Sequence, residues 1–347
     1  MQVIARLVLC LVFLFGCATP NRLSKKKPIH HTENGFKNNY LSEKIMTKSL
    51  LDVLRWRVTR KPQEPIEFEK DKPDISFLQT NRSESTLTWI GHSTFLWQHM
   101  GVNLITDPHL TNRASPVGFA GPKRVLLPAI SLEDLPLIDI VVISHNHYDH
   151  LDKKSVLGLV ARQKKSPPVF VVPLGMKAWF KKIGISEGVM ELDWWGSHQV
   201  GDWTLNAVPV QHWSRRTLGD TNRVLWAGWV IETPQQKLFF AGDTGYSQDF
   251  LDIGRKFGRM DLSLIPIGAY APRWFMKDMH CTPEEAVQIH LDVASKRSIG
   301  MHWGTFLDLT DEPMNEPPER LRKAVEAKNL DPQCFVTMKH GETIRGI

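Results

Sequence analysis

The sequence has few cysteines, lacks a hydrophobic run long enough to cross a bilayer, and shows no evident internal repeat. It holds four cysteines in 347 residues, and its apolar segment Leu7–Phe15 is too short for a transmembrane helix. No RNA- or DNA-binding module is recognisable, so the formal charge of +6 favours another acidic partner, such as a phospholipid surface or a phosphate-bearing substrate, over nucleic acid. With 23% charged and 42% hydrophobic residues, the composition is that of a globular protein with one large domain and an extension.

The N-terminus has the proportions of a bacterial secretion signal. One positive charge precedes the apolar core Leu7–Phe15, and Gly16 and Cys17 follow it. A cysteine after a small residue at this place resembles the lipoprotein box, in which the cysteine is lipidated and becomes the new first residue. Residues 1–17 are therefore predicted to be a lipoprotein signal peptide, with a plain secretory signal cut slightly later as the alternative. Ala18 favours the outer membrane, so the predicted location is the bacterial cell envelope, lipid-anchored and facing the periplasm.

Residues 18–85 are predicted to form a tether and an N-terminal arm. Residues 21–40 are polar and lack a periodic apolar pattern, which indicates a solvated linker. Residues 42–60 place apolar side chains at three- and four-residue spacings and end in a basic cluster. This pattern predicts a helix that packs on the domain, with a position on anionic lipid as the alternative. From Thr86 onward short strand and helix patterns alternate, so residues 86–347 are predicted to form one folded domain.

The folded domain is predicted to mix short strands with helices. The predicted strands cover residues 86–90, 94–98, 102–106, 138–143, 169–172, 204–210, 225–232, 237–240, 262–266 and 298–301. The predicted helices cover residues 153–162, 176–183, 283–294 and 318–328. The third helix starts with Thr282, Pro283 and Glu285, the residues of a capping box with proline in the first turn. Strands in two runs, each with helices to cover it, indicate the α/β class.

The most informative segment follows the strand predicted at residues 138–143. It reads His145, Asn146, His147, Tyr148, Asp149, His150. Two histidines at positions i and i+2 can face one side and share an ion, while Asp149 and His150 turn toward a second ion. Imidazole and carboxylate ligands without thiolate favour zinc over iron or manganese. A histidine-rich surface loop without metal is the alternative interpretation.

Three further residues of metal-ligand type each follow a short apolar run: His212, Asp243 and His302. The ends of strands are where α/β folds collect their chemistry. Taken singly, each residue also suits a hydrogen-bonded structural role. A two-metal site needs about six or seven protein groups. The common position of these residues therefore predicts one metal site with the ligands His145, His147, Asp149, His150, His212, Asp243 and His302.

The order of these motifs resembles the metallo-β-lactamase superfamily. The amino-acid sequence of the segments more closely resembles the N-acylphosphatidylethanolamine-hydrolysing phospholipase D family. The segments that carry the resemblance are Ser144–Asp152, Glu191–Trp195, Gln211–Trp213, Phe239–Tyr246, Ile265–Tyr270, Pro272–Lys277 and Ile299–Phe306. The resemblance implies an αββα sandwich and makes residues 86–347 the catalytic domain.

The resemblance also implies two zinc ions per chain and a role for each ligand. The first zinc would be held by His145, His147 and His212. The second would be held by Asp149, His150 and His302, and Asp243 would bridge the two. Two such cations lower the pKa of a water molecule, so no protein nucleophile is required.

The implied activity is that of a zinc phosphodiesterase that cuts N-acylated ethanolamine phospholipids into phosphatidic acid and N-acylethanolamine. Asp149, His280 and Arg216 are the catalytic candidates. His280 would contact phosphate or protonate the leaving group, and Arg216 would offer its guanidinium to the phosphate. Asp107 is expected to orient a ligand histidine, with a turn-forming aspartate before a proline as the alternative. The segment 274–279 is expected to touch acyl chains.

Two other functions stay open at this point. The first is a metallo-hydrolase of another phosphodiester or a lactone. The second is a non-catalytic, membrane-anchored lipid-binding protein. Fold analogy does not separate the hydrolases, but seven intact ligand positions argue against mere binding. The expected partners are a phospholipid substrate and a membrane surface reached through lipidated Cys17, without nucleic acid. A homodimer is left open, as is the pairing of Cys281 with Cys334, the two thiols that remain after Cys10 is removed.

Overall fold

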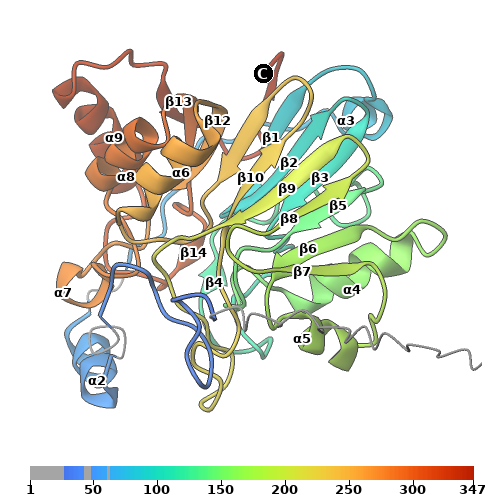
Figure 1. Cartoon of the computed structure of the whole chain (residues 1–347). Coiled ribbons are helices and arrows are strands. Elements are labelled where there is room, and N and C mark those ends of the chain that lie inside the picture. The colour runs from blue at the N-terminus through green and yellow to red at the C-terminus, as the bar shows by residue number, and fades with distance from the viewer. Residues whose placement is uncertain (1–26, 43–47, 61–62) are drawn as a thin grey trace, which may run out of the picture.

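Two seven-stranded β-sheets lie face to face between two layers of helices (Figure 1). The computed structural model describes residues 27–42, 48–60 and 63–347. Helices α4 and α5 cover the outer face of the first sheet, and α6, α8 and α9 cover that of the second. This arrangement is the αββα sandwich that the sequence predicts.

The first sheet has the strand order β16-β1-β2-β3-β5-β6-β7. Its strands are β1 (Thr86–Gly91), β2 (Thr94–His99), β3 (Val102–Thr106), β5 (Ile140–Val142), β6 (Val169–Pro173), β7 (Val189–Leu192) and β16 (Thr343–Arg345). β3, β5, β6 and β7 are parallel, whereas β16, β1, β2 and β3 pair antiparallel. The carboxyl ends of the parallel strands therefore lie at one edge of the sheet.

The second sheet has the order β15-β13-β12-β11-β10-β9-β8. Its strands are β8 (Ser197–Val200), β9 (Trp203–Val208), β10 (Gly228–Glu232), β11 (Lys237–Phe240), β12 (Met260–Pro266), β13 (Ser295–Met301) and β15 (Phe335–Thr337). β11, β12, β13 and β15 are parallel. A separate two-stranded ribbon joins β4 (Lys123–Arg124) to β14 (Phe306–Leu307).

The described helices are α2 (Leu50–Thr59), α3 (Ile75–Thr80), α4 (Lys153–Arg162), α5 (Lys177–Lys182), α6 (Asp249–Phe257), α7 (Arg273–Met276), α8 (Pro283–Asp292) and α9 (Glu316–Ala327). The predicted capping box of α8 is present, since Thr282 and Glu285 each accept from the other's backbone N–H. None of these described helices is both long enough and apolar enough to span a bilayer.

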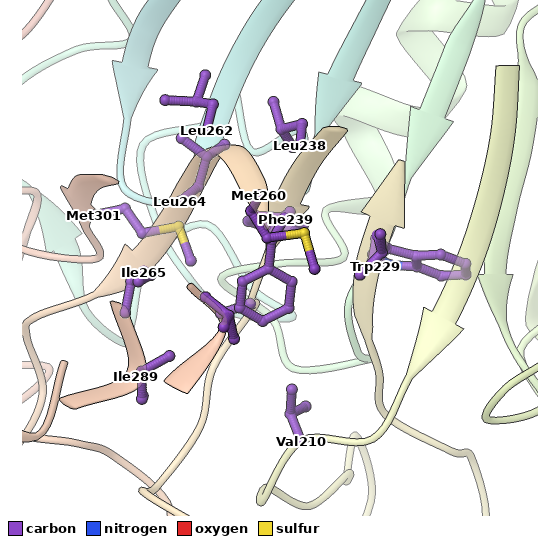
Figure 2. Close-up of a cluster of buried hydrophobic side chains, with 14 of the residues drawn as sticks. Val210, Trp229, Leu238, Phe239, Met260, Leu262, Leu264, Ile265, Ile289 and Met301 are labelled. Atoms are coloured by element: carbon purple, nitrogen blue, oxygen red, sulfur yellow. The ribbon is translucent and has the colours of Figure 1, made fainter. Parts of the chain in front are cut away.

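Alternating side chains of the strands build two separate cores. In β5, Ile140 and Val142 face the second sheet, whereas Val141 between them packs with α4 residues. Figure 2 shows part of the larger core, which lies on both faces of the second sheet: the indole of Trp229 donates to the carbonyl oxygen of Ile143 after β5, whereas the ring of Phe239 lies against Phe250 of α6. Burial on both faces explains why the central strands read as continuous apolar runs in the sequence.

Every predicted strand and helix is found, with boundary shifts of a few residues. The prediction missed mainly the strands at the sheet edges, β7, β8, β15 and β16, and the helix α6. β8 has half-buried and exposed positions and is largely polar, so its composition carries little strand signal. The strand predicted at residues 138–143 is shorter in the structure, because only Ile140–Val142 is in the ladder.

Residues 28–41 pack on the domain, so the prediction of a solvated linker is wrong for this segment. The adjacent pair His30–His31 donates from both Nε2 atoms to the two carboxylate oxygens of Asp193, at 2.7 and 2.8 Å. Asn38 is buried. Its side-chain Nδ2–H donates to the carbonyl oxygen of His212 at 2.9 Å, and its Oδ1 accepts from the backbone N–H of His212 at 3.1 Å. These polar residues form hydrogen bonds with groups of the domain and not with water, and composition alone does not reveal this.

The helix predicted within residues 42–60 is α2, and it packs against α7 at the side of the sandwich (Figure 1). The ring of Trp56 stacks on Phe275 with centroids 5.0 Å apart, and its indole N–H donates to Asp311. The signal peptide at residues 1–17 and the anchor Cys17 lie outside the described residues and stay predictions.

The two cysteines predicted to remain in the domain are separate thiols within the described structure. Cys281 is buried and donates its S–H to the carbonyl oxygen of Pro266 at 3.1 Å. Burial raises the pKa of this thiol. A buried, protonated thiol is a poor nucleophile, so Cys281 acts as a packing residue beside the site.

Candidate metal centre

The predicted ligands come together from both sheets at one edge of the sandwich. The segment His145–His150 follows β5 in the first sheet, whereas Asp243 follows β11 and His302 follows β13 in the second. Gly242 allows the two sheets to meet here, because a Cβ at this residue would lie 2.5 Å from the Cβ of Ser144. Its φ of +61° also suits glycine.

His145, His147 and His212 form the first cluster of imidazole nitrogens. Nδ1 of His147 lies 2.8 Å from Nε2 of His145 and 3.2 Å from Nε2 of His212. The Nδ1–H of His212 donates to the carbonyl oxygen of Met279 at 3.0 Å, and Nδ1 of His145 pairs with Ser144 Oγ at 2.9 Å. The Nε2 atoms therefore present lone pairs to the centre of the cluster, and one cation satisfies all three rings at once.

Asp149, His150 and His302 form the second cluster. Oδ2 of Asp149 lies 3.4 Å from Nε2 of His150 and 3.5 Å from Nε2 of His302. Asp243 stands between the clusters: its Oδ2 is 3.2 and 3.1 Å from these two nitrogens and 3.9 Å from Nε2 of His145 and of His212. All seven predicted ligands are thus brought together, and Asp243 occupies the predicted bridging position.

The chemistry of the buried atoms fits a pair of metal ions. Within the described part of the chain, Nε2 of His150, Nε2 of His302 and Oδ1 of Asp243 are buried without a hydrogen-bond partner. Buried polar atoms without partners are costly unless a ligand satisfies them. Imidazole nitrogens and carboxylate oxygens without thiolate are the donor set expected for zinc and related cations.

The three histidines of the first cluster and Asp243 are held in the protonation states that metal binding requires. Burial lowers the pKa of His147 to about 4 and lowers the pKa values of His145 and His212 well below the usual range. Burial alone would raise the pKa of Asp243, but the nearby His150 and His302 hold it well below its usual range. The first cluster is therefore ready to bind a cation near pH 7. In the second cluster burial lowers the histidine pKa values, but the carboxylates of Asp243 and Asp149 raise that of His302 to about 9 and that of His150 well above its usual range, so a cation that binds there displaces protons.

Asp107 is hydrogen-bonded to the predicted ligand His150. It follows β3 and is fully buried. Its Oδ2 accepts from Nδ1–H of His150 at 2.6 Å and from the hydroxyl of Ser144, which in turn contacts His145 Nδ1. The carboxylate therefore fixes the tautomer of one ligand histidine directly and of another through a hydroxyl.

His280 lies beside the centre. Its Nδ1 is 4.0 Å from Oδ2 of Asp243, and its ring centroid is 5.2 Å from that of His212. The segment leading to it consists of α7, in which Trp274 is 41% exposed and Met276 is buried, and the turn after it, in which Met279 is buried. A histidine and an apolar wall therefore border the metal clusters on this side.

Arg216 forms hydrogen bonds within residues 145–151, the ligand loop. Its Nη1 donates to the carbonyl oxygens of Asn146 and Leu151, at 2.9 and 2.8 Å. The guanidinium lies over the ring of Tyr148 at 4.0 Å and near that of Trp179. The described hydrogen bonds of this side chain go to the segment that carries the histidines, so its predicted contact with phosphate stays a prediction.

His92 belongs to the centre but was not predicted. It is fully buried, and its Nε2–H donates to Oδ2 of Asp149 at 3.1 Å. The residue sits in the turn between β1 and β2, far from the motifs that signalled metal binding. A histidine directly after Gly91, at the end of a buried strand, was the one signal in the sequence that pointed to it.

Comparison with known proteins identifies the family. The model of the β-lactamase superfamily domain matches residues 102–303. A Caenorhabditis elegans protein named N-acyl-phosphatidylethanolamine-hydrolyzing phospholipase D 1 is 44% identical over 273 residues, which cover 75% of this chain and 76% of that protein. The chain belongs to this phospholipase D family of the metallo-β-lactamase superfamily. The predicted family is therefore confirmed.

Other relatives agree with this assignment. The mitochondrial protein of Saccharomyces cerevisiae named N-acyl-phosphatidylethanolamine-hydrolyzing phospholipase D is 36% identical over 255 residues, 72% of this chain and 53% of the yeast protein. A solved metallo hydrolase from the archaeon Ignicoccus hospitalis is 20% identical with a TM-score of 0.57, over 76% of this chain and 99% of that one, and shows the fold alone. The prediction of an enzyme is confirmed: the chain is a metal-dependent hydrolase of the metallo-β-lactamase fold.

Proposed function

We propose that this member of the phospholipase D family hydrolyses the distal phosphodiester bond of N-acylated ethanolamine phospholipids, with two zinc ions, at a membrane surface. The observation that carries the substrate is the name of the Caenorhabditis relative, which matches three quarters of both chains. His145, His147 and His212 would hold one ion, and Asp149, His150 and His302 the other. When bound, the ions supply Lewis acidity at the phosphoryl group and a water molecule of lowered pKa.

His280 supports a phosphodiester substrate. Burial lowers its pKa to about 4, so the ring is neutral at pH 7 and has one N–H to donate. The side chain borders Asp243 and His212, where a phosphoryl oxygen would lie. A neutral ring suits binding of a phosphoryl oxygen better than standing ready as a proton donor.

A groove beside the ligand loop supports an anionic lipid. It has a volume of about 910 Å³ and runs past Tyr148 and Arg216 at the loop. Lys153, Lys154 and Lys182 line it together with apolar and aromatic residues, among them Met176, Trp179 and Ile183. A mixed basic and apolar lining matches a molecule that carries both a phosphate group and acyl chains.

An exposed apolar row on α2 supports work at a membrane. Leu51, Leu54 and Val58, the α2 stripe, are 76%, 58% and 78% exposed and lie at three- and four-residue spacings on one face. Arg55 and Arg57 are exposed beside them. Trp56 fastens the other side of the helix to α7, which leads into His280. An apolar row flanked by cations suits anionic lipid, and it would place the site at the membrane.

The proposed location is the bacterial cell envelope, with the chain anchored by a lipid on Cys17. The support is the sequence of residues 1–17 and the stripe on α2. An anchor of this kind would keep the groove near its substrate, because a tethered enzyme meets the membrane at a high effective concentration.

The test is an assay of the purified chain with zinc on a panel of lipid phosphodiesters, with products identified by mass. Release of N-acylethanolamine and phosphatidic acid is expected to be the fastest reaction. Asp243→Asn is the inactive control, and a lactone and a β-lactam are included as competing substrates. Faster opening of either ring than cleavage of any phosphodiester would refute the lipid substrate and leave a metallo-hydrolase of other specificity.

A further inference from the structure

His92 contacts the second cluster although it lies outside the segments that carry the predicted ligands. It lies in the turn between β1 and β2, and its side chain is buried. Its Nε2–H donates to Oδ2 of Asp149 at 3.1 Å, and its ring lies on that of His302 with centroids 4.0 Å apart. The ring also lies near that of His150, with centroids 5.1 Å apart, so one side chain contacts all three residues of this cluster.

The backbone of His92 is tied to the same cluster. Its carbonyl oxygen accepts from the N–H of His302 at 3.2 Å and from the indole N–H of Trp89 at 2.9 Å, and its own N–H donates to Thr305 Oγ1 at 2.8 Å. The φ angles of His92 and His302 are +57° and +63°. Non-glycine residues adopt this left-handed conformation only where the surroundings impose it, and strain of this kind gathers at functional sites.

The hydrogen bond to Asp149 leaves the carboxylate able to hold a cation. A carboxylate oxygen has two lone pairs, so Oδ2 can accept from His92 and still face Nε2 of His150 and of His302. Without a donor, the carboxyl group of Asp149 would rotate about its broad terminal torsion. His92 also spans the two sheets, since it belongs to the first and fixes His302 of the second.

We infer that His92 is a positioning residue for the second metal ion: it fixes the carboxylate of Asp149 through its side chain and the loop of His302 through its backbone. The inference rests on the metal centre of the proposed function and not on its lipid substrate. Metal content therefore decides it, whichever phosphodiester the enzyme cleaves.

The experiment measures zinc affinity at each of the two sites in the full chain by competition with a chelator. His147→Ala and His302→Ala assign the two dissociation steps to the first and second ion. His92→Phe keeps an aromatic ring and removes the N–H donor. We expect it to weaken the second site about 10- to 100-fold and leave the first unchanged, as removal of a group that orients a metal ligand does.

Two further variants separate positioning from packing. His92→Gln carries an N–H close to the place of Nε2, so it should recover most of the lost affinity. His109→Phe is the matched control, because His109 is buried too and contacts the same ring: its centroid is 5.0 Å from that of Phe306, and the centroid of His92 is 4.9 Å from it. Its zinc affinities should equal those of the unaltered chain. Cobalt in the second site should show a changed absorption spectrum in His92→Phe alone.

The outcomes are decisive in both directions. The inference is overturned if a folded His92→Phe binds zinc at both sites as tightly as the unaltered chain does. It is also overturned if His109→Phe loses as much affinity at the second site as His92→Phe does. His92→Leu replaces the phenylalanine variant if that one does not fold. If both variants stay unfolded in saturating zinc while His109→Phe folds, His92 serves the fold and not the metal, which also overturns it. Normal metal binding with no lipid hydrolysis would refute the substrate and leave this inference standing.

Discussion

Asp243 is expected to decide whether the centre holds one metal ion or two, because its Oδ2 faces both clusters. Asp243→Ala removes the shared anion and leaves two cations facing each other, so we expect about one metal ion or fewer per chain and at least about a hundredfold lower turnover. Elemental analysis after purification with zinc gives the count. Asp249→Ala, which removes a buried carboxylate bonded to Ser247 and Asn39, is the control. Full activity in Asp243→Ala would mean that the bridge is misassigned.

Asp107 acts one step further from the metals. Asp107→Asn keeps the size of the side chain but removes the charge that fixes the Nδ1–H tautomer of His150. We expect zinc affinity to fall about 10- to 100-fold while the fold is retained. Chelator competition measures the first effect and the melting temperature monitors the second. An unchanged affinity would return Asp107 to the role of a turn residue.

Single residues were predictable where they carry a pattern. The seven ligands stand at the ends of apolar runs, and strand direction brings such ends together. His92 and Asn38 have no such signal: their contacts with Asp149 and His212 depend on how distant segments pack. Polarity indicated solvent for Asn38, whereas the folded chain uses its amide inside the protein.

Elements were predictable in proportion to their burial. β5, β6 and β11 are buried on both faces and stand out as apolar runs, while β8 and β16 lie at sheet edges with mixed exposure. The capping box of α8 fixed its start, because Thr282, Pro283 and Glu285 act within one turn. Local chemistry thus predicts helix starts, but an edge strand forms only because a neighbour offers hydrogen bonds.

The α2 stripe makes a prediction at the scale of the element. Replacing all three of its residues with glutamine should weaken binding to phosphatidylglycerol vesicles by about tenfold or more for each side chain that enters the lipid, because roughly 1.5–3 kcal/mol of transfer free energy is lost per side chain. The full chain with Cys17→Ser is used so that no acyl anchor contributes. Leu218→Gln, at a residue 94% exposed elsewhere, should have no effect. If the triple variant binds vesicles as tightly as the same chain with an unaltered α2 stripe, α2 does not contact the membrane.

For the molecule as a whole, buried neutral histidines tie stability to pH. Burial lowers the pKa values of His109 and His340 to about 4, from 6.5 when unfolded. Between these values the unfolded chain binds more protons, so the free energy of unfolding falls as pH drops from 6.5 toward 4, by up to about 1.4 kcal/mol per pH unit and histidine. Denaturant titrations of metal-free protein should show this. His340→Gln should make the dependence shallower, and an unchanged slope would contradict it.

The attachment of the whole molecule to the membrane is predicted to depend on Cys17. Cys17→Ser removes the acyl acceptor, so labelled palmitate should no longer be incorporated and the precursor should accumulate. Gel mobility and autoradiography of cells that express either form measure both effects. Cys281→Ser, at a buried thiol, is the control and should label normally. Continued labelling of Cys17→Ser would reveal a different anchor.

The pairing of β1 with β16 sets an order of events during synthesis. Residues 343–345 complete the ladder beside residues 86–88, and they leave the ribosome long after β1. Until then β1 has no neighbouring strand at one edge, and His302 has been synthesised only shortly before. We therefore expect the sandwich to close, and both clusters to hold zinc stably, only after residues 343–345 have paired with β1. Metal supply in the compartment where folding ends, rather than where translation occurs, would then determine how much active enzyme a cell contains.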